Sequence, residues 1–419
     1  MMWPMVPFSK VAEIVTGNTP PRKNPENYGP GVPWVKPPDL DGWEPITCTN
    51  ETLSPMGQKI ARLLPEKTVL VCCIGSIGRV GIAGTTLSTN QQINSLIFGP
   101  SVSPRFGYHY CRFIPQVFQA AARKAVLPIL NKSNFAKIKM PLPPPSEQRR
   151  IVEILDQADA LRKKRTEADT KAARILPTLF YKMFGDPATN QKQWPIRKLG
   201  TLVEEPVFGL SKPLSNKTEH EPGTTPILRM ANINPDGYLN MESLRYEKVP
   251  KKSLDRYLVK RGDLLFNWRN SPKWVGKTAI FNVDGDYSYA SFLFRLRVLP
   301  EAANNKYIWQ FLNLLVSDGW FMQKCRQAVS QANFGRNELA DIDVPFPPLD
   351  AQKKFGNAYD KVCGHLQDVS CAKRKLEELF KNMLYRSFTG DLTAKWREAH
   401  MKELLAEMKI QEKYLEAKL

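Results

Sequence analysis

The apolar positions between residues 355 and 383 recur in alternating steps of four and three. The positions are Phe355, Tyr359, Val362, Leu366, Val369, Leu376, Phe380 and Met383, with Lys373 filling one slot. An earlier segment repeats this spacing at Ile154, Ala158, Leu161, Ala168, Ala172, Ile175 and Leu179, with Arg165 interrupting it. A 3.5-residue period is typical of helices that pack against each other. The pattern therefore predicts two long helices that are natural partners.

Both helices begin at the same kind of joint. Residues 141–148 read P-L-P-P-P-S-E-Q, and residues 345–352, 204 positions later, read P-F-P-P-L-D-A-Q. Proline continues neither a helix interior nor a strand interior, so each cluster predicts a stiff connection. Ser146 and Asp350 are then favourable N-cap residues. The register holds without a gap to the end of each helix, so the chain contains an internal repeat.

The segment before each helix favours strands over helix. Short apolar runs at 69–71 and 80–83, and again at 264–266 and 278–281, are separated by Gly- and Asn-containing loops and are typical of hairpins. Amphipathic helices are expected at 108–123 and 306–324. We predict an α+β chain with two mixed α/β domains. The expected boundaries are 1–144 for the first domain, 145–186 for its helix, 187–348 for the second domain, 349–389 for its helix and 390–419 for a C-terminal helical tail.

The charge balance favours a nucleic-acid partner. The chain has 60 Lys and Arg residues and 41 Asp and Glu residues, which gives a net charge of +19 and a pI near 9.5. A strongly basic surface attracts nucleic acid or anionic membranes. No apolar run approaches the roughly 20 residues of a membrane span, and the first residues do not resemble a signal peptide. We therefore expect a cytoplasmic protein without a membrane partner.

Motifs for metal binding and catalysis are missing. The seven cysteines form no C-x-x-C pair and the four histidines lie far apart, which argues against a zinc site. The chain has no phosphate-binding loop, no N-P-P-[FY] tetrapeptide of amino-methyltransferases and no hydrolase signature. A catalytic site built from scattered residues stays open, because the absence of a motif is weak evidence. We expect a protein without catalytic or metal-binding residues.

With these features in order, the chain resembles the specificity subunit of type I restriction–modification systems. The resemblance rests on the W-P opening of each half (3–4 and 194–195) and the loops G-N-T-P at 17–20 and G-L-S-K-P at 209–213. It also rests on the G-S-I-G turn at 75–78 with N-Q-Q-I at 90–93, the Pro joints, F-G-D-P at 184–187 and S-F-T-G-D-L-T at 387–393. These motifs cover essentially the whole chain, and most occur twice.

The resemblance implies a target recognition domain followed by a spacer helix in each half. It implies that the helices pair as an antiparallel coiled coil with approximate two-fold symmetry, and that each domain reads half of a split, asymmetric target in double-stranded DNA. Methylation (M) subunits would dock around the helices, and motor–nuclease (R) subunits would join the complex. The chain itself would bind no cofactor, while S-adenosylmethionine, ATP and magnesium would bind to the partner subunits.

Arg, Lys, Asn and Gln side chains read base edges, and Lys, Arg and hydroxyl groups contact phosphates. In the first domain the candidates are Lys36, Ser76, Arg79, Asn90, Gln91, Gln92, Asn131 and Lys132. In the second domain they are Arg229, Asn232, Asn267, Arg269, Lys273, Lys277, Tyr289 and Arg336. The sequence aligns Asn90-Gln91-Gln92 with Tyr289-Ala290-Ser291, and Lys132 with Arg336. Different loops on equivalent scaffolds suit two half-sites of different sequence.

Two alternatives remain open. The chain could serve a type IIB-like system, in which a separate subunit carries both methylation and cleavage. It could instead be a helical adaptor whose basic domains bind RNA, or bind nucleic acid without sequence preference. Salt dependence and a specificity ratio on random duplexes would separate the adaptor from the two sequence-specific readings.

Overall fold

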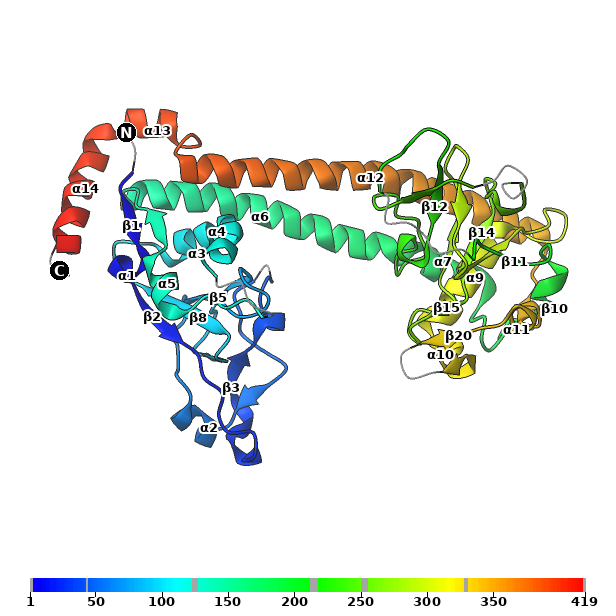
Figure 1. Cartoon of the computed structure of the whole chain (residues 1–419), viewed down its shortest axis with the longest axis horizontal. Helices are drawn as coiled ribbons and strands as arrows, with labels where there is room; N and C mark the ends of the chain where they lie inside the picture. The colour runs from blue at the N-terminus through cyan, green and yellow to red at the C-terminus, as the bar shows by residue number, and fades with distance from the viewer. Residues whose placement is uncertain are drawn as a thin grey trace. The chain divides into compact units, whose positions relative to one another are not determined.

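The computed structural model describes residues 3–42, 44–122, 127–211, 218–249, 255–327 and 331–416, without the side chains of 327, 366–371 and 373. Its contacts divide the chain into a first unit, Met1–Thr166 with Ala372–Leu419, and a second unit, Glu167–Cys371 (Figure 1). The side chains at the predicted heptad positions Leu366, Val369 and Lys373 are not among those described, and the helix end at 123 and residues 212–213 of the second G-x-x-P-like loop lie outside the described residues.

The described residues of the first unit form three small sheets. Four antiparallel strands run in the order β2 (Ala12–Thr16), β8 (Ile93–Phe98), β5 (Val69–Cys72) and β6 (Val80–Ile82). A second sheet places β3 (Tyr28–Val35) between antiparallel β4 (Thr52–Leu53) and parallel β7 (Ser88–Thr89). The outermost pair joins β1 (Met5–Pro7) to β9 (Lys139–Pro141), so the first strand lies beside the strand that leads into the Pro joint.

The second unit repeats this topology. Its four-stranded sheet has the order β11 (Val207–Phe208), β18 (Leu293–Leu296), β14 (Leu264–Asn267) and β16 (Thr278–Ile280). Its β12 (Thr225–Leu228) lies between antiparallel β13 (Arg245–Glu247) and parallel β17 (Ser288–Tyr289), and β10 (Ile196–Lys198) pairs with β21 (Asp343–Pro345). The predicted duplication of a mixed α/β domain is therefore confirmed strand by strand. In the second unit β15 (Arg269–Asn270), β20 (Ala332–Asn333) and β19 (Arg326–Gln327) form a further small sheet, and in the first unit a bridge between Ile74 and Ile129 stands at the place of the β15–β20 pairing.

The domain helices are more broken than the sequence predicts. The segment expected to form one helix at 108–123 forms α3 (Pro104–Phe113) and α4 (Pro115–Ala121). Pro115 starts α4 because it has no N–H to bond back into α3. The segment expected at 306–324 forms α9 (Asn305–Ser317) and α10 (Trp320–Lys324), which are separated by Gly319 with a φ of 73°. The remaining short helices are α1 (Phe8–Val11), α2 (Pro55–Ile60), α5 (Lys132–Lys137), α11 (Arg336–Ala340), η1 (Pro25–Asn27), η2 (Pro37–Asp39), η3 (Leu199–Thr201) and η4 (Met230–Asn232).

The first long helix also has a break that the heptad pattern does not predict. It consists of α6 (Pro145–Ala173) and α7 (Ile175–Phe184), whereas its counterpart α12 (Leu349–Thr389) is continuous. Pro177 explains the difference, because it lacks the N–H that would bond to the carbonyl of Ala173 and its ring clashes with that turn. The predicted C-terminal tail forms α13 (Ala394–Ala399) and α14 (Met401–Glu416).

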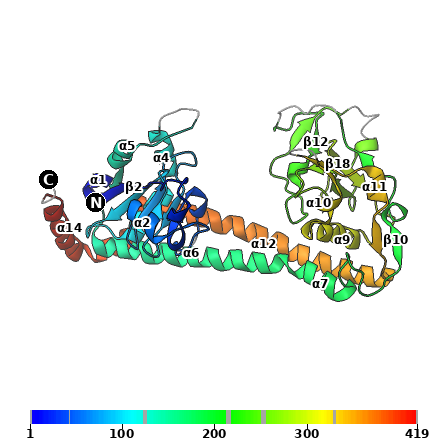
Figure 2. The same ribbon diagram turned by 90° about the horizontal axis from the view of Figure 1, so that it is seen from below.

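The two long helices contact each other in each unit. In the first unit the guanidinium of Arg162 donates to both carboxylate oxygens of Glu377, at 3.0 and 2.6 Å, and lies 4.0 Å from the ring centroid of Phe380. In the second unit Phe184 packs edge-on against Phe355, with 5.9 Å between ring centroids. Within the same unit, Asp169 and Ala173 of α6 line one pocket with Tyr359 and Cys363 of α12. Phe184, later in the chain, thus contacts the earlier Phe355, so in this unit the two helices run antiparallel (Figure 2).

The glutamine shared by both Pro joints fixes each domain to its helix. Gln148 is buried, and its side-chain oxygen accepts a hydrogen bond from the backbone N–H of Ser103 at 2.8 Å. Gln352 is buried and accepts from the backbone N–H of Asn304 at 3.0 Å. Both side-chain amides also donate to a proline carbonyl of their own joint. Because buried backbone groups need partners, this residue explains why the two joints match.

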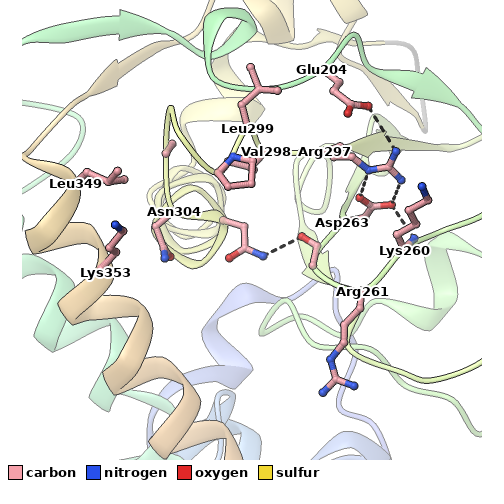
Figure 3. A pocket seen from close by; sticks show the side chains of 14 residues that line it. Glu204, Lys260, Arg261, Asp263, Arg297, Val298, Leu299, Asn304, Leu349 and Lys353 are labelled. Atoms are coloured by element: carbon pink, nitrogen blue, oxygen red, sulfur yellow. Dashed lines mark hydrogen bonds and ion pairs between the residues drawn. The ribbon is translucent and has the colours of Figure 1, made fainter.

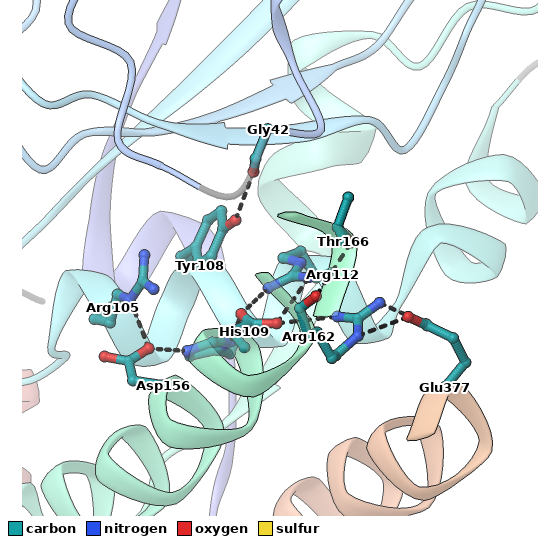
Figure 4. Close-up of polar contacts among 10 residues, drawn as sticks. Gly42, Arg105, Tyr108, His109, Arg112, Asp156, Arg162, Thr166 and Glu377 are labelled. Carbon is teal, nitrogen blue, oxygen red and sulfur yellow. Dashed lines mark hydrogen bonds and ion pairs between the residues drawn. The ribbon is translucent and has the colours of Figure 1, made fainter. Parts of the chain in front are cut away.

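An ionic cluster ties the first domain to α6 (Figure 4). Arg105 and His109 of α3 both bond to the carboxylate of Asp156, at 2.8 and 2.7 Å. Arg112, one turn further along, pairs with Asp159. Burial lowers the pKa of His109, although the neighbouring Asp156 acts in the opposite direction. The second unit keeps one of these pairs as Lys306–Asp360 and places Gln310 at the position of His109.

Candidate nucleic-acid interface

The loops that carry the first-domain candidates meet at one end of the four-stranded sheet. The backbone N–H of Cys73, after β5, donates to the carbonyl of Gln92, before β8, at 2.7 Å. Gly75 donates to Pro128 at 3.1 Å, in the segment that leads to Asn131. Three loops far apart in sequence are therefore held together by backbone hydrogen bonds. Their side chains share one edge of the domain, as a binding surface requires.

The glycine of the G-x-x-P-like loops lets this loop touch the neighbouring turn. A Cβ atom on Gly17 would lie 2.2 Å from the carbonyl oxygen of Asn90, and one on Gly209 would lie 2.3 Å from that of Ala290. Real Cβ atoms do not approach backbone this closely, so only glycine fits at either position. The motif therefore serves close backbone packing in both units.

Backbone hydrogen bonds correct the predicted alignment of the β7–β8 and β17–β18 turns. The N–H of Asn90 bonds to Val35, and the N–H of Ala290 bonds to Leu228, the residue at the same place in β12. Ala290, rather than Tyr289, is therefore the counterpart of Asn90. One-residue errors of this kind arise because loops of different composition carry no periodic signal.

The first-domain candidates differ in how much they face solvent. Exposed candidates are Ser76, Gln91 and Lys132, partly exposed ones are Lys36, Arg79, Gln92 and Asn131, and Asn90 is buried. Several of them have local partners. Lys36 pairs with Glu51, Arg79 bonds to Asp41 at 2.5 Å, Asn131 caps α5 through the N–H of Asn134, and Asn90 donates to Gln92 at 2.8 Å. Ser76, Gln91 and Lys132 are the candidates most accessible to a ligand.

In the second domain half of the candidates are buried. Lys273 and Arg336 are exposed, Arg229 and Arg269 are partly exposed, and Asn232, Asn267, Lys277 and Tyr289 are buried. The buried group bonds to backbone carbonyls of adjoining loops. Asn232 donates to Asn240, Asn267 to Phe292, Lys277 to Ile233 and Tyr289 to Val207. In this structure these four side chains hold the loops in place and do not face solvent.

The ionic states of the basic candidates follow from these surroundings. Burial lowers the pKa of Lys277. Burial, followed by repulsion from Arg245, lowers the pKa of Arg229. In the first domain Lys36 holds the pKa of Glu51 below its usual value, with Arg22 contributing. The positive charge of Lys36 is thus partly neutralised by Glu51, whereas exposed Lys132 and Lys273 offer theirs to solvent.

An aromatic and cationic cluster in the first domain was not predicted from the sequence. The guanidinium of Arg22 lies 5.2 Å from the ring centroid of Tyr28 and 5.4 Å from that of Trp34, and it pairs with Glu51 at 3.0 Å. Arg22 is more than half exposed. The only signal in the sequence is a basic residue two positions after the G-x-x-P loop, which a charge count does not distinguish from other surface residues.

A pocket of about 510 Å³ lies in the second unit between its domain and the start of α12 (Figure 3). Arg297 donates to both oxygens of Asp263 at 2.8 Å, and Glu204 lies 3.5 Å from the same guanidinium. These pairs occupy the acidic groups of the pocket, and the rest of its lining is basic, as at Lys260 and Lys353, amide or apolar. The acidic side chains that line this pocket form ion pairs with Arg297, and its lining does not place a nucleophilic side chain beside a general base.

The described residues contain no group of three or more His, Cys, Asp or Glu side chains that could hold a metal ion. Within the same ranges no helix is long and apolar enough to cross a membrane. The chemistry available at the loop edges is therefore that of hydrogen-bond donors, acceptors and positive charge.

Comparison with known proteins gives a consistent result. The family model described as "Type I restriction modification DNA specificity domain" matches residues 2–170 and 191–364. The chain is similar to the type I restriction enzyme MjaIX specificity subunit of Methanocaldococcus jannaschii, with 25% identity over 48% of this chain and 52% of that protein. It is similar to the HindI specificity subunit of Haemophilus influenzae, with 32% identity over 37% of this chain and 36% of that protein. The matches thus span about half or less of these two relatives.

Longer but more distant similarities extend along the chain. The StySPI specificity subunit of Salmonella potsdam is 20% identical over 94% of this chain and 90% of its own length. A chain in a solved type I R-M system has a TM-score of 0.54 at 19% identity, covering 93% of this chain and 98% of that one. The S subunit from M. genitalium has a TM-score of 0.51 at 15% identity, covering 92% and 96%. At these identities the structures support the shared fold.

Proposed function

The chain belongs to the type I restriction–modification DNA specificity family, and we propose that it is the non-catalytic subunit that selects the DNA target of such a complex. One observation carries the proposal. The family model matches both halves, and both halves fold with the same strand order while their loops differ. Two equivalent scaffolds with different loops are suited to reading two different half-sites.

We propose that each domain reads one half of a bipartite, asymmetric target in double-stranded DNA. The edge loops offer amide and hydroxyl groups at Gln91 and Ser76 in the first unit, and a guanidinium at Arg269 in the second. Side chains of these types read base edges in the major groove. Exposed Lys132 and Lys273 are suited to phosphates. The net charge of +19 supports the same partner.

The remaining partners follow from the family. We propose that M subunits seat on the long helices, that R subunits join the complex, and that the protein works in the cytoplasm. S-adenosylmethionine, ATP and magnesium would then bind to those partners, and no cofactor to this chain. Exposed apolar side chains on the long helices, Leu161, Ile175 and Leu379, support a protein partner along them.

The test is target selection by the complete methylation complex. The chain is produced together with M subunits encoded beside it, and methylated sites are mapped on genomic DNA. The proposal predicts one bipartite motif with an unspecified gap, which disappears when this chain is omitted. Methylation that is unchanged without the chain, or binding to random duplexes without preference at every salt concentration, would contradict it.

A further inference from the structure

Arg269 in the second unit is held in a fixed position at the loop edge. It is the first residue of β15, which pairs with β20 in a small sheet of the second unit. Arg269 lies in the loop between Asn267 and Gly276, which is three residues longer than the loop between Cys72 and Gly78. The alignment of Cys73 with Trp268 makes Ile74, which bridges to Ile129, the counterpart of Arg269, which pairs with Asn333 on β20 (Figure 1). The three extra residues therefore follow Arg269, and the second domain has an arginine where the first has isoleucine.

Two contacts fix the orientation of the guanidinium. The Nε of Arg269 donates to the side-chain oxygen of Gln331 at 2.8 Å, and the guanidinium carbon lies 5.0 Å from the ring centroid of Phe292. Among the described residues neither terminal nitrogen of Arg269 has a partner. The arginine is partly exposed and Gln331 is exposed. The side chain is therefore fixed at Nε and on one face, while its two-nitrogen edge stays available.

The loop that carries Arg269 is held by hydrogen bonds of its neighbours Trp268 and Asn267. Trp268 donates its indole N–H to the carbonyl of Ser291 at 2.6 Å and stacks on Phe294 with 5.6 Å between ring centroids. Buried Asn267 donates to the carbonyls of Arg269 and Phe292, at 3.1 and 2.9 Å. These bonds join the arginine's loop to the loop that carries the Phe292 ring. Pre-organisation of this kind reduces the entropy lost on binding.

We propose that Arg269 reads a guanine in the half-site of the second domain. A guanidinium edge with two parallel N–H donors matches the O6 and N7 acceptors of guanine in the major groove, a pattern that no other base presents there. A phosphate contact would not require the orientation of the guanidinium plane to be fixed by the Nε bond to Gln331 and by the Phe292 ring. The inference rests on the proposed DNA-reading function and goes further by assigning one base to one residue.

The first domain has different residues at the positions equivalent to Trp268 and Phe292. Backbone bonding places Cys73 at the position of Trp268 and Gln92 at the position of Phe292. Neither of these two first-unit residues is aromatic, so the first unit has no counterpart of the Phe292 ring at that position, and the exposed candidate of the same turn is Gln91. The guanine assignment applies to the second half-site alone.

The test uses the full chain in complex with its M subunits and a panel of short duplexes. The selected motif is determined first, and each base pair is then changed singly. A further set replaces each guanine with 7-deazaguanine, which lacks the N7 acceptor. Wild-type binding should fall between about fivefold and 150-fold when one guanine of the second half-site is substituted. The 7-deaza analogue should weaken binding at that same position.

Arg269→Lys is the decisive variant, because lysine keeps the positive charge but lacks the two parallel N–H donors of the guanidinium. It should bind all bases at that position alike and should be insensitive to 7-deazaguanine there. Gln331→Ala should weaken the preference partially. Lys273→Ala is the matched control: it removes an exposed cation of the same loop that lies over Trp274. It should weaken binding evenly across the panel and reduce the salt slope by about one.

Each alternative outcome has a distinct meaning. If the wild-type complex selects no motif, the proposed function fails together with the inference. If it selects a motif but Arg269→Lys keeps every base preference, only the guanine assignment fails. A loss spread evenly over all positions in Arg269→Lys would make Arg269 a phosphate contact, and would equally overturn the assignment.

Discussion

The C-terminal tail closes on the first Pro joint through a buried carboxylate, and this contact permits a quantitative test. Glu147 has no solvent exposure and accepts from Trp3 Nε1 at 2.9 Å, Thr393 Oγ1 at 2.6 Å and Arg397 Nε at 2.8 Å. A second nitrogen of Arg397 donates to the carbonyl of Gly390 at 2.7 Å. Residues near both ends of the chain thus neutralise and hydrogen-bond a single buried charge.

Replacing Arg397 with alanine leaves this carboxylate buried without its cation. Removing one partner of a buried ion pair costs about 3–5 kcal/mol. For a unit of roughly 200 residues, this free-energy loss lowers the melting temperature by on the order of 10 °C. Thermal unfolding of the full-length chain measures the shift. Hydrogen exchange of α13 and α14 shows whether the tail opens first.

Two controls separate the ion pair from general damage. The double variant Glu147→Gln with Arg397→Met removes both charges and should recover most of the loss, because an uncharged pair no longer needs compensation. Arg150→Ala breaks the exposed pair with Glu153 on the same helix and should cost less than about 1 kcal/mol. An Arg397→Ala protein as stable as Arg150→Ala would refute the reasoning.

Two further predictions concern single positions. Gly276→Ala should strongly destabilise the second unit, because φ is +94° and the added Cβ would lie 2.4 Å from the Phe321 ring; circular dichroism would check this, and unchanged stability would contradict it. The pKa of buried His109 is lowered from 6.5, so the unfolded chain binds this proton at a higher pH than the folded chain. Stability of the first unit should therefore fall as the pH drops below about 6.5. His109→Gln, which introduces the residue found at position 310, should remove this pH dependence. The measurement is a series of melting curves at different pH values, and parallel curves for wild type and variant would contradict the prediction.

The sequence predicted the parts of the structure that carry a periodic or repeated signal. The heptad spacing and the matched Pro joints located both long helices, and the shared glutamine of the joints proved to be buried at equivalent places. Gly17 and Gly209, singled out by repetition, are the positions where backbone leaves no room for a side chain. These signals can be read from the sequence because the same packing contacts restrict the residue type at equivalent positions of both copies.

The parts that could not be predicted depend on tertiary contacts. Asn232, Asn267, Lys277 and Tyr289 have the chemistry of DNA readers, but adjoining loops present backbone carbonyls that only a folded chain brings near them. A polar residue in a loop can face inward when a buried backbone group needs a partner. Spacing along the chain carries no sign of this choice.

The helix breaks are a different case. Pro115 and Pro177 were visible in the sequence, and each marks the break that the structure contains. The apolar periodicity continues across both positions, so the pattern alone predicted longer helices. The local proline rule decides the boundary in each case, because a missing N–H and a steric clash cannot be offset by the apolar pattern.

The most direct test of the central claim is an exchange of the first domain. Residues 1–140 are replaced by the corresponding domain of another family member, the chimaera is produced with its M subunits, and the methylated motif is mapped genome-wide. If each domain reads its own half-site, one half of the motif changes while the other half stays the same. A motif that changes in both halves, or in neither, would contradict the assignment of one half-site to each domain.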